Sequence, residues 1–218
     1  MPRDDLILAF DTSAAHCAAA LVSGGQVLAH RSEEMACGQA ERLFPLLEEL
    51  LAEAGAGWKD LNRIGVGIGP GNFTGTRISV SAARGLALSL EIPALGVSTF
   101  EALAHGLPRP LIASVDARAG RLYLQRLADG TEEPPLLVSR DSLPSAWFAP
   151  GMLVVGHAAP ELAALLGGQS VPAAVPLAQA IAAIAATRTA DRAARPAPLY
   201  LRPADAAPPR DSAPVILP

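Results

Sequence analysis

The sequence predicts an α/β protein made of two tandem halves, each with a mixed β-sheet, the second half being truncated. The first observation is the element order: three strands joined by turns precede strands that are separated by helices. Hairpin-joined strands run antiparallel and helix-joined strands run parallel, so one sheet that holds both is mixed. The second observation is an internal repeat, in which residues 111–116, with the strand and turn after them, resemble residues 8–11 with the next strand and turn.

The first half alternates short apolar runs with segments of helical period. Strands are predicted at residues 6–10, 16–22, 26–31, 63–69 and 93–97, and helices at residues 40–54, 76–90 and 98–105. Ser98 is expected to cap the last of these helices, because Glu101 stands at the capping-box position. This order is that of a ribonuclease H-like or actin-like half.

The second half carries fewer elements. Strands are predicted at residues 111–116, 121–127 and 152–155, and helices at residues 161–166 and 177–188. We therefore divide the chain into a first half (1–106), a shortened second half (107–202) and an extended tail (203–218). Asp11 and Asp116 occupy equivalent strand ends in the repeat, where ligands gather in open α/β sheets. The alternative to a duplicated unit is that two unrelated hairpins resemble each other by chance.

Composition and charge exclude several classes of protein. Half of the 218 residues are apolar, only 17% are charged and 4% are aromatic, and the net charge is −4. These values argue against a disordered chain, an aromatic platform for single-stranded nucleic acid and a broad basic surface for nucleic acid or membranes. No apolar stretch has the length of a membrane span. Two cysteines cannot form a disulfide framework, and the four histidines have no metal-binding spacing, so we expect a cytoplasmic protein without a metal or cofactor.

A glycine-rich loop, Gly-Pro-Gly-Asn-Phe-Thr-Gly-Thr-Arg at residues 69–77, lies between a predicted strand and a predicted helix. Amide groups at a helix start, beside glycines that lack a Cβ, can hold an anion. The candidate nucleotide- or phosphate-binding residues are Asp11, Thr12, Ser13, Gly69, Gly71, Asn72, Thr74, Gly75, Thr76 and Asp116. The alternative is a tight strand-to-helix connection capped by Thr74 or Thr76, since neither the P-loop pattern nor G-x-G-x-x-G fits.

Several motifs together resemble the TsaB (YeaZ) family. They are Leu-Ala-Phe-Asp-Thr-Ser at 8–13, the glycine-rich loop, Gly-Leu-Ala at 85–87, Gly-Val-Ser-Thr at 96–99, Asp-Ala-Arg at 116–118 and Tyr-Leu-Arg-Pro at 200–203. The resemblance implies an actin-like ATPase fold with a shortened second half. It also implies a role in making N6-threonylcarbamoyladenosine at position 37 of tRNA, as a partner of the catalytic paralogue TsaD and of the ATPase TsaE.

The resemblance further implies a non-catalytic subunit. The paralogue holds its metal through a His-x-x-x-His pair on a helix, whereas Thr99 and Leu103 stand at those positions here. We keep two alternative functions: an active ATPase or kinase that uses Asp11 or Asp116 with magnesium, and, with less support, a zinc glycoprotease. The family also implies a homodimer when the protein is alone, and contact with tRNA only through the complex.

The resemblance implies a partner surface on the first helix and the start of the next. The residues assigned to it are Gln39, Glu41, Leu43, Leu46, Leu47, Leu50, Leu51 and Arg77. Leu46 lies off the main apolar stripe and is expected to be exposed, which would mark a contact with a partner. The alternative is that all five leucines belong to the core. Arg188, Arg192, Arg195 and Arg202 are candidates for contact with tRNA phosphates, the alternative being a solvated helix end.

Overall fold

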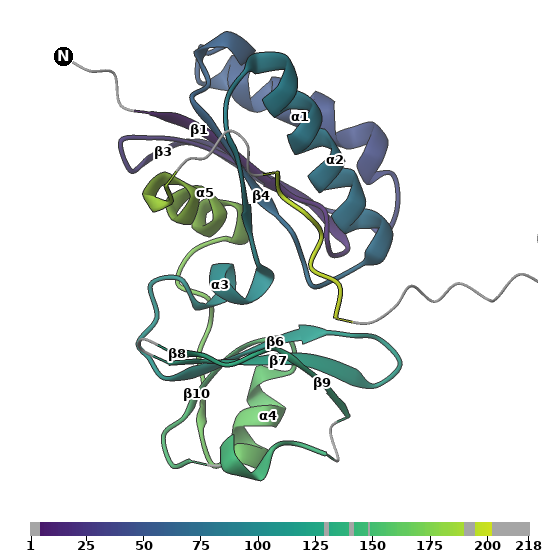
Figure 1. Ribbon diagram of the computed structural model, residues 1–218, viewed down its shortest axis with the longest axis vertical. Helices are drawn as coiled ribbons and strands as arrows, with labels where there is room; N and C mark the ends of the chain where they lie inside the picture. Colours follow the sequence, from purple (N-terminus) through teal and green to yellow (C-terminus); the bar gives the residue numbers. More distant parts are fainter. Residues whose placement is uncertain (1–4, 129–130, 140–141, 148, 190–194, 202–218) are drawn as a thin grey trace, which may run out of the picture.

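The computed structural model describes residues 5–128, 131–139, 142–147, 149–189 and 195–201, which form two mixed sheets stacked end to end (Figure 1). The first sheet has the order β3-β2-β1-β4-β5. Its strands are β1 (Leu6–Asp11), β2 (His16–Ser23), β3 (Gln26–Glu34), β4 (Arg63–Gly67) and β5 (Ala94–Val97). β1 runs antiparallel to β2 and parallel to β4, which confirms the predicted mixed sheet.

Helices cover both faces of this sheet because β1 is apolar on both sides. Leu8 and Phe10 pack toward α1 (Gln39–Glu53) and α2 (Phe73–Leu90), whereas Ile7 and Ala9 pack toward α5 (Leu177–Thr187) (Figure 1). Successive side chains of a strand point to opposite faces, so this alternation places β1 at the centre of a three-layer half. α5 therefore lies on the first sheet, although it comes after the second sheet in the chain.

The second sheet repeats the topology of the first. Its order is β11-β10-β6-β7-β8, and β9 also pairs with β7. The strands are β6 (Leu111–Asp116), β7 (Arg121–Ala128), β8 (Thr131–Glu132), β9 (Leu136–Ser139), β10 (Leu153–Gly156) and β11 (Gln169–Ser170). The β6–β7 hairpin and the parallel strands β10 and β11 correspond to β1–β2, β4 and β5. This arrangement confirms the actin-like fold of two halves.

One helix packs on each face of the second sheet. α4 (Ala159–Leu166) covers one face, and α3 (Thr99–Ala104) lies between the two sheets, in contact with β6 and α5 (Figure 1). Two short 3-10 turns, η1 (Trp58–Asp60) and η2 (Ser145–Trp147), complete the elements. The predicted boundaries at residues 106 and 202 stay predictions, and the predicted tail at 203–218 lies outside the described residues.

Two helix starts show how local sequence sets the elements. The capping box at α3 is confirmed: Ser98 Oγ accepts from the amide of Glu101 at 3.2 Å, and the amide of Ser98 donates to Glu101 Oε2 at 2.9 Å. α2 begins at Phe73, three residues before the predicted start, because the side chain of Asn72 caps it.

Within the described part of the chain, no helix combines the length and apolar character that crossing a bilayer requires.

Candidate functional site

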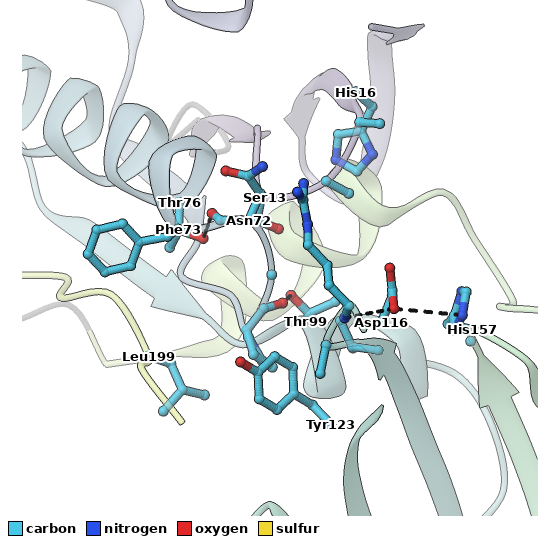
Figure 2. A pocket seen from close by; sticks show the side chains of 18 of the residues that line it. Ser13, His16, Asn72, Phe73, Thr76, Thr99, Asp116, Tyr123, His157 and Leu199 are labelled. Atoms are coloured by element: carbon cyan, nitrogen blue, oxygen red, sulfur yellow. Dashed lines mark hydrogen bonds and ion pairs between the residues drawn. The ribbon is translucent and has the colours of Figure 1, made fainter. Parts of the chain in front are cut away.

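A cavity of about 750 Å³ lies between the two halves. The turn between β1 and β2, the glycine-rich loop before α2 and the start of α3 form one side. The end of β6, the turn after it and the residue after β10 form the other (Figure 2). The carboxyl ends of β1 and β6 both point toward this space, as expected where ligands bind in α/β sheets. The volume is that of a typical small-molecule site.

Asp11 lies at the end of β1, is fully buried, and is not among the residues that line the cavity. Its Oδ1 accepts from the amide and the hydroxyl of Ser13, at 3.0 and 2.9 Å, and lies 2.7 Å from His16 Nε2. Its Oδ2 has no hydrogen-bond partner among the described residues. A Cβ at Gly67 would lie 1.9 Å from this Oδ2, so only glycine leaves room for the carboxyl group.

The spacing of the histidines in the sequence predicts only a surface or packing role for His16. The structure places His16 at the cavity (Figure 2). Its Nε2 lies 2.7 Å from Oδ1 of Asp11. One signal in the sequence points to this pair: Asp11 ends one strand and His16 begins the next, so the short turn between them brings the two side chains together.

The glycine-rich loop packs tightly on the β1–β2 turn. A Cβ on Gly71 would lie 2.3 Å from the carbonyl oxygen of Ser13, and a Cβ on Gly75 would lie 1.9 Å from that of Thr12. The amide of Asn72 donates to the Ser13 oxygen at 2.5 Å, and Thr12 Oγ1 donates to the Gly75 oxygen at 2.7 Å. The glycines are thus needed for contact between two segments of the chain.

Polar groups in the first turn of α2 also find hydrogen-bond partners within the loop. Asn72 Oδ1 accepts from the amide of Gly75 at 3.0 Å, and Thr76 Oγ1 donates to the carbonyl oxygen of Asn72 at 2.9 Å. This geometry favours the alternative of a tight connection, with Asn72 rather than Thr74 or Thr76 as the cap. Phosphate binding by Gly69 and the rest of this loop stays a prediction.

The second half presents a different set of polar groups to the cavity. Asp116 at the end of β6 is half exposed, and its Oδ1 accepts from the amide of Arg118 at 2.9 Å and lies 4.0 Å from His157 Nε2 (Figure 2). Ser114 is fully buried, lines the cavity, and its hydroxyl has no partner among the described residues. The equivalent acids of the two halves therefore differ: Asp11 is enclosed by protein, whereas Asp116 is open to the cavity.

Thr99 and Leu103, which stand where the resemblance implies a histidine pair in the TsaD paralogue, also line the cavity. Thr99 Oγ1 donates to the carbonyl oxygen of Pro70 at 3.1 Å, and Leu103 adds apolar surface. Residues 5–128, 131–139, 142–147, 149–189 and 195–201 contain no group of three or more His, Cys, Asp or Glu side chains placed to hold a metal ion.

The expectation that Leu46 is exposed is wrong. Leu46 is fully buried, and its four neighbouring leucines are at most 3% exposed. They are Leu43, Leu47, Leu50 and Leu51. α1 packs on the sheet and also against α2, so its buried face is wider than one stripe, and these leucines form the core of the first half. The alternative explanation, that all of them are core residues, therefore describes the free chain.

Of the other residues of the predicted partner surface, one is exposed and two make hydrogen bonds within the chain. Glu41 is exposed, whereas Gln39 Nε2 donates to the carbonyl oxygen of Met35 at 3.0 Å. Arg77 Nε donates within the chain to the hydroxyl of Tyr200 at 2.8 Å. On the same helix as Glu41, Phe44 is 43% exposed, so it is the large apolar side chain that α1 presents to solvent.

A cluster of charges joins α1 to the edge strand β3. Arg42 donates to both oxygens of Glu33, at 2.7 and 2.6 Å, and to Glu49 Oε1 at 2.6 Å. Hydrogen bonds from Arg42 lower the pKa values of Glu33 and Glu49, and they raise the pKa of Arg42.

Cys17 on β2 is buried, and burial raises the pKa of its thiol to about 11, so this thiol is protonated at neutral pH.

One arginine of the basic C-terminal stretch is already hydrogen-bonded within the fold. The guanidinium of Arg188 donates to Glu101 Oε1 and to the carbonyl oxygen of Gly96, which ties the end of α5 to α3 and β5. Arg188 is therefore already paired and does not offer a free charge to a phosphate. Arg195 is exposed, and Arg192 and Arg202 lie outside the described residues.

Comparison with known proteins links this chain to tRNA modification proteins. A family model described as TsaD, tRNA N6-adenosine threonylcarbamoyltransferase, matches residues 33–133. The tRNA threonylcarbamoyladenosine biosynthesis protein TsaB of Escherichia coli K12 is 39% identical over 122 residues, which cover 54% of this chain and 52% of that protein. This chain thus spans about half the length of the curated TsaB relatives that it matches.

Two further similarities extend over nearly the whole chain. An uncharacterized protein of Mycobacterium tuberculosis H37Rv is 34% identical over 206 residues, which cover 93% of this chain and 94% of that one. The crystal structure of a Pseudomonas aeruginosa protein, described as similar to peptidase YEAZ, superposes with a TM-score of 0.72 at 27% identity. It covers 91% of this chain and 100% of that chain.

Proposed function

Because the chain belongs to the TsaB (YeaZ) family, we propose that it acts in the synthesis of N6-threonylcarbamoyladenosine in tRNA as a non-catalytic subunit. In this role it binds and supports a TsaD-type transferase, works with a TsaE-type ATPase, and meets tRNA only through the assembled complex. The chain forms a homodimer when it is alone.

The observation that carries the non-catalytic role is the state of Asp11. In an ATPase of this fold, a strand-end carboxylate has to reach a magnesium ion beside the nucleotide phosphates. Oδ1 of Asp11 already faces three donors from Ser13 and His16, Oδ2 lies against Gly67 without a hydrogen-bond partner among the described residues, and Asp11 is not among the residues that line the cavity. The adjacent glycine-rich loop is closed by its contacts with Thr12 and Ser13. These residues therefore do not fit a magnesium nucleotide in the described conformation.

An active ATPase is the second candidate, and the observation that favours it is on the other wall of the cavity. Asp116 is half exposed and lines a space large enough for a nucleotide. This candidate predicts that the purified chain alone hydrolyses ATP, and that Asp116→Asn removes the hydrolysis.

The partner surface is proposed on the exposed side of α1. The buried leucines support this helix from inside, while Phe44 and Glu41 face solvent. An exposed apolar side chain on a helix that also carries charges is typical of a protein contact. Placing a carboxylate at the centre of such a contact leaves a charge that is desolvated without a partner. Phe44→Glu is therefore expected to weaken binding of the transferase at least tenfold.

Leu165→Glu is the matched control. Leu165 is 53% exposed, lies on α4 in the second half, and is separated from α1 by the whole first sheet (Figure 1). The expected result is normal binding by Leu165→Glu and weak binding by Phe44→Glu, with both variants as stable as the parent. Equal binding by both variants would remove α1 from the interface.

Reconstitution tests the function itself. Purified TsaD-type and TsaE-type proteins, tRNA and the threonylcarbamoyl donor are combined with and without this chain, and the modified adenosine is measured. We expect modification only when the chain is present and no modification by the chain alone. Equal modification without the chain would refute the scaffold role, and ATP hydrolysis by the isolated chain would establish the second candidate.

A further inference from the structure

We propose that residues 195–201 form a latch that closes the cavity between the two halves, with the contact between Arg77 and Tyr200 as its catch. The latch is independent of the role in tRNA modification, since it rests on contacts within this chain. It gives the cavity two states, one closed by the segment and one open to solvent.

The segment reaches the cavity from the first half and is fastened there by contacts of three kinds. The amide of Leu199 donates to the carbonyl oxygen of Ile68 at 2.8 Å, directly after β4. The hydroxyl of Tyr200 accepts from Arg77 Nε at 2.8 Å. The rings of Tyr200 and Phe73 have centroids 4.9 Å apart, and Arg77 Cζ lies 5.8 Å from the Tyr200 centroid. Together these contacts hold the segment to the residue after β4 and to the start of α2.

The next residue fastens the same segment to the second half. Leu201 packs against the buried cluster that contains Phe100, Leu111 and Tyr123. Leu199, Tyr200 and Leu201 all line the cavity, and Figure 2 shows Leu199 on the side of the glycine-rich loop. The segment is thus a wall of the cavity that spans both halves.

The catch is weak enough to open without unfolding the protein. Tyr200 is 44% exposed and Arg77 is exposed, so solvent competes for the hydrogen bond and screens the cation–π contact. Residues 195–201 carry no helix or strand, and the amide of Leu199 donates to the carbonyl oxygen of Ile68, the residue after β4. Only Pro196 of this segment is buried, and segments whose side chains are mostly exposed or half-buried open more often than the core does. Leu103 and Leu177 line the same cavity as the segment.

Hydrogen exchange measured by NMR tests the latch at a single amide. The Leu199 amide reports on the segment, and the amide of Ile68, which donates to the Val97 oxygen at 3.0 Å, reports on the sheet beside it. We expect the Leu199 amide to exchange at least tenfold faster than the Ile68 amide. Tyr200→Ala should accelerate Leu199 at least tenfold further and leave Ile68 unchanged. Tyr200→Phe, which removes only the hydroxyl acceptor, should accelerate Leu199 by a smaller factor.

Two results would overturn the proposal. If Leu199 and Ile68 exchange at the same rate, the segment opens only when the protein unfolds. If Tyr200→Ala leaves Leu199 exchange unchanged, the contact with Arg77 is not the catch. Arg77→Met keeps the aliphatic stem and removes the donor, so it provides the same test if Tyr200→Ala does not fold.

Access to the cavity is measured separately by alkylation. In a Cys37→Ser background, Thr99→Cys places a thiol on the cavity wall, and iodoacetamide is the probe. We expect Tyr200→Ala to raise the alkylation rate of this thiol at least tenfold, while Leu165→Ala on α4 leaves it unchanged. An unchanged rate with Tyr200→Ala would show that the segment does not close the cavity.

Discussion

Two glycines in α2 allow the packing of the glycine-rich loop to be tested within one helix. A Cβ at Gly75 would lie 1.9 Å from the carbonyl oxygen of Thr12, whereas ordinary contact begins at 3.4 Å. Gly85 is ten residues further along the same helix, is exposed, and has no atom within 4 Å of its Cβ position. Gly75→Ala therefore tests the contact, and Gly85→Ala measures the effect of the same substitution without it.

Gly75→Ala and Gly85→Ala are expected to change the free energy of unfolding in opposite directions. Alanine in place of glycine inside a helix stabilises by roughly 0.5–1 kcal/mol. At Gly75 this gain is outweighed by overpacking, about 1–3 kcal/mol, and by the strained or lost hydrogen bond from Thr12 Oγ1, about 1 kcal/mol. We expect Gly75→Ala to lower the free energy of unfolding by about 2 kcal/mol. Gly85→Ala should raise it by about 0.5–1 kcal/mol.

Urea unfolding followed by circular dichroism measures both variants, and thermal unfolding provides a second readout. For a chain of this length, 1 kcal/mol corresponds to roughly 2–4 °C in Tm. Gly75→Ala should therefore melt roughly 4–8 °C below the parent, and Gly85→Ala slightly above it. If Gly75→Ala is as stable as Gly85→Ala, then α2 does not press on the β1–β2 turn, and the glycines of the loop remain free for another role such as phosphate binding.

Two further predictions concern titratable groups. The exposed Cys37 should react with a thiol reagent at pH 8 in the native protein, while Cys17, buried and with its pKa raised to about 11, should react only after unfolding; two thiols labelled at equal rates in the native state would contradict this. The lowered pKa values of Glu33 and Glu49 mean that their pairing with Arg42 stabilises the fold above the ordinary glutamate pKa of about 4.3, and that this stabilisation is lost as the pH falls through the lowered values. Arg42→Met should thus be less stable than the parent at pH 7 and equally stable near pH 2 in urea unfolding, and a difference that persists at the lower pH would contradict the assignment.

Hydrophobic period predicted most of the strands and helices, and it failed where an element is short or begins with polar residues. No strand is predicted at β9, because its four residues are too few to show a hydrophobic periodicity. The predicted start of α2 lies three residues too late, because the apolar pattern does not mark Asn72 as the cap. The capping box of α3 was found because both of its members lie within four residues. Local signals of this kind depend only on neighbouring residues.

The order of the elements, the mixed sheets and the repeat can be predicted from the residues alone, because each depends on the hydrophobic periodicity and the turns of a continuous segment. What each face of an element packs against depends on the tertiary structure. α5 lies on the first sheet, Leu46 is buried on the inner face of α1, and Arg77 contacts Tyr200 across 123 residues of sequence. The residue types at these positions fit several environments equally well. Their roles depend on contacts between segments that are distant in the sequence: α1 with the first sheet for Leu46, and the return of the chain from the second half to the first for α5 and Tyr200.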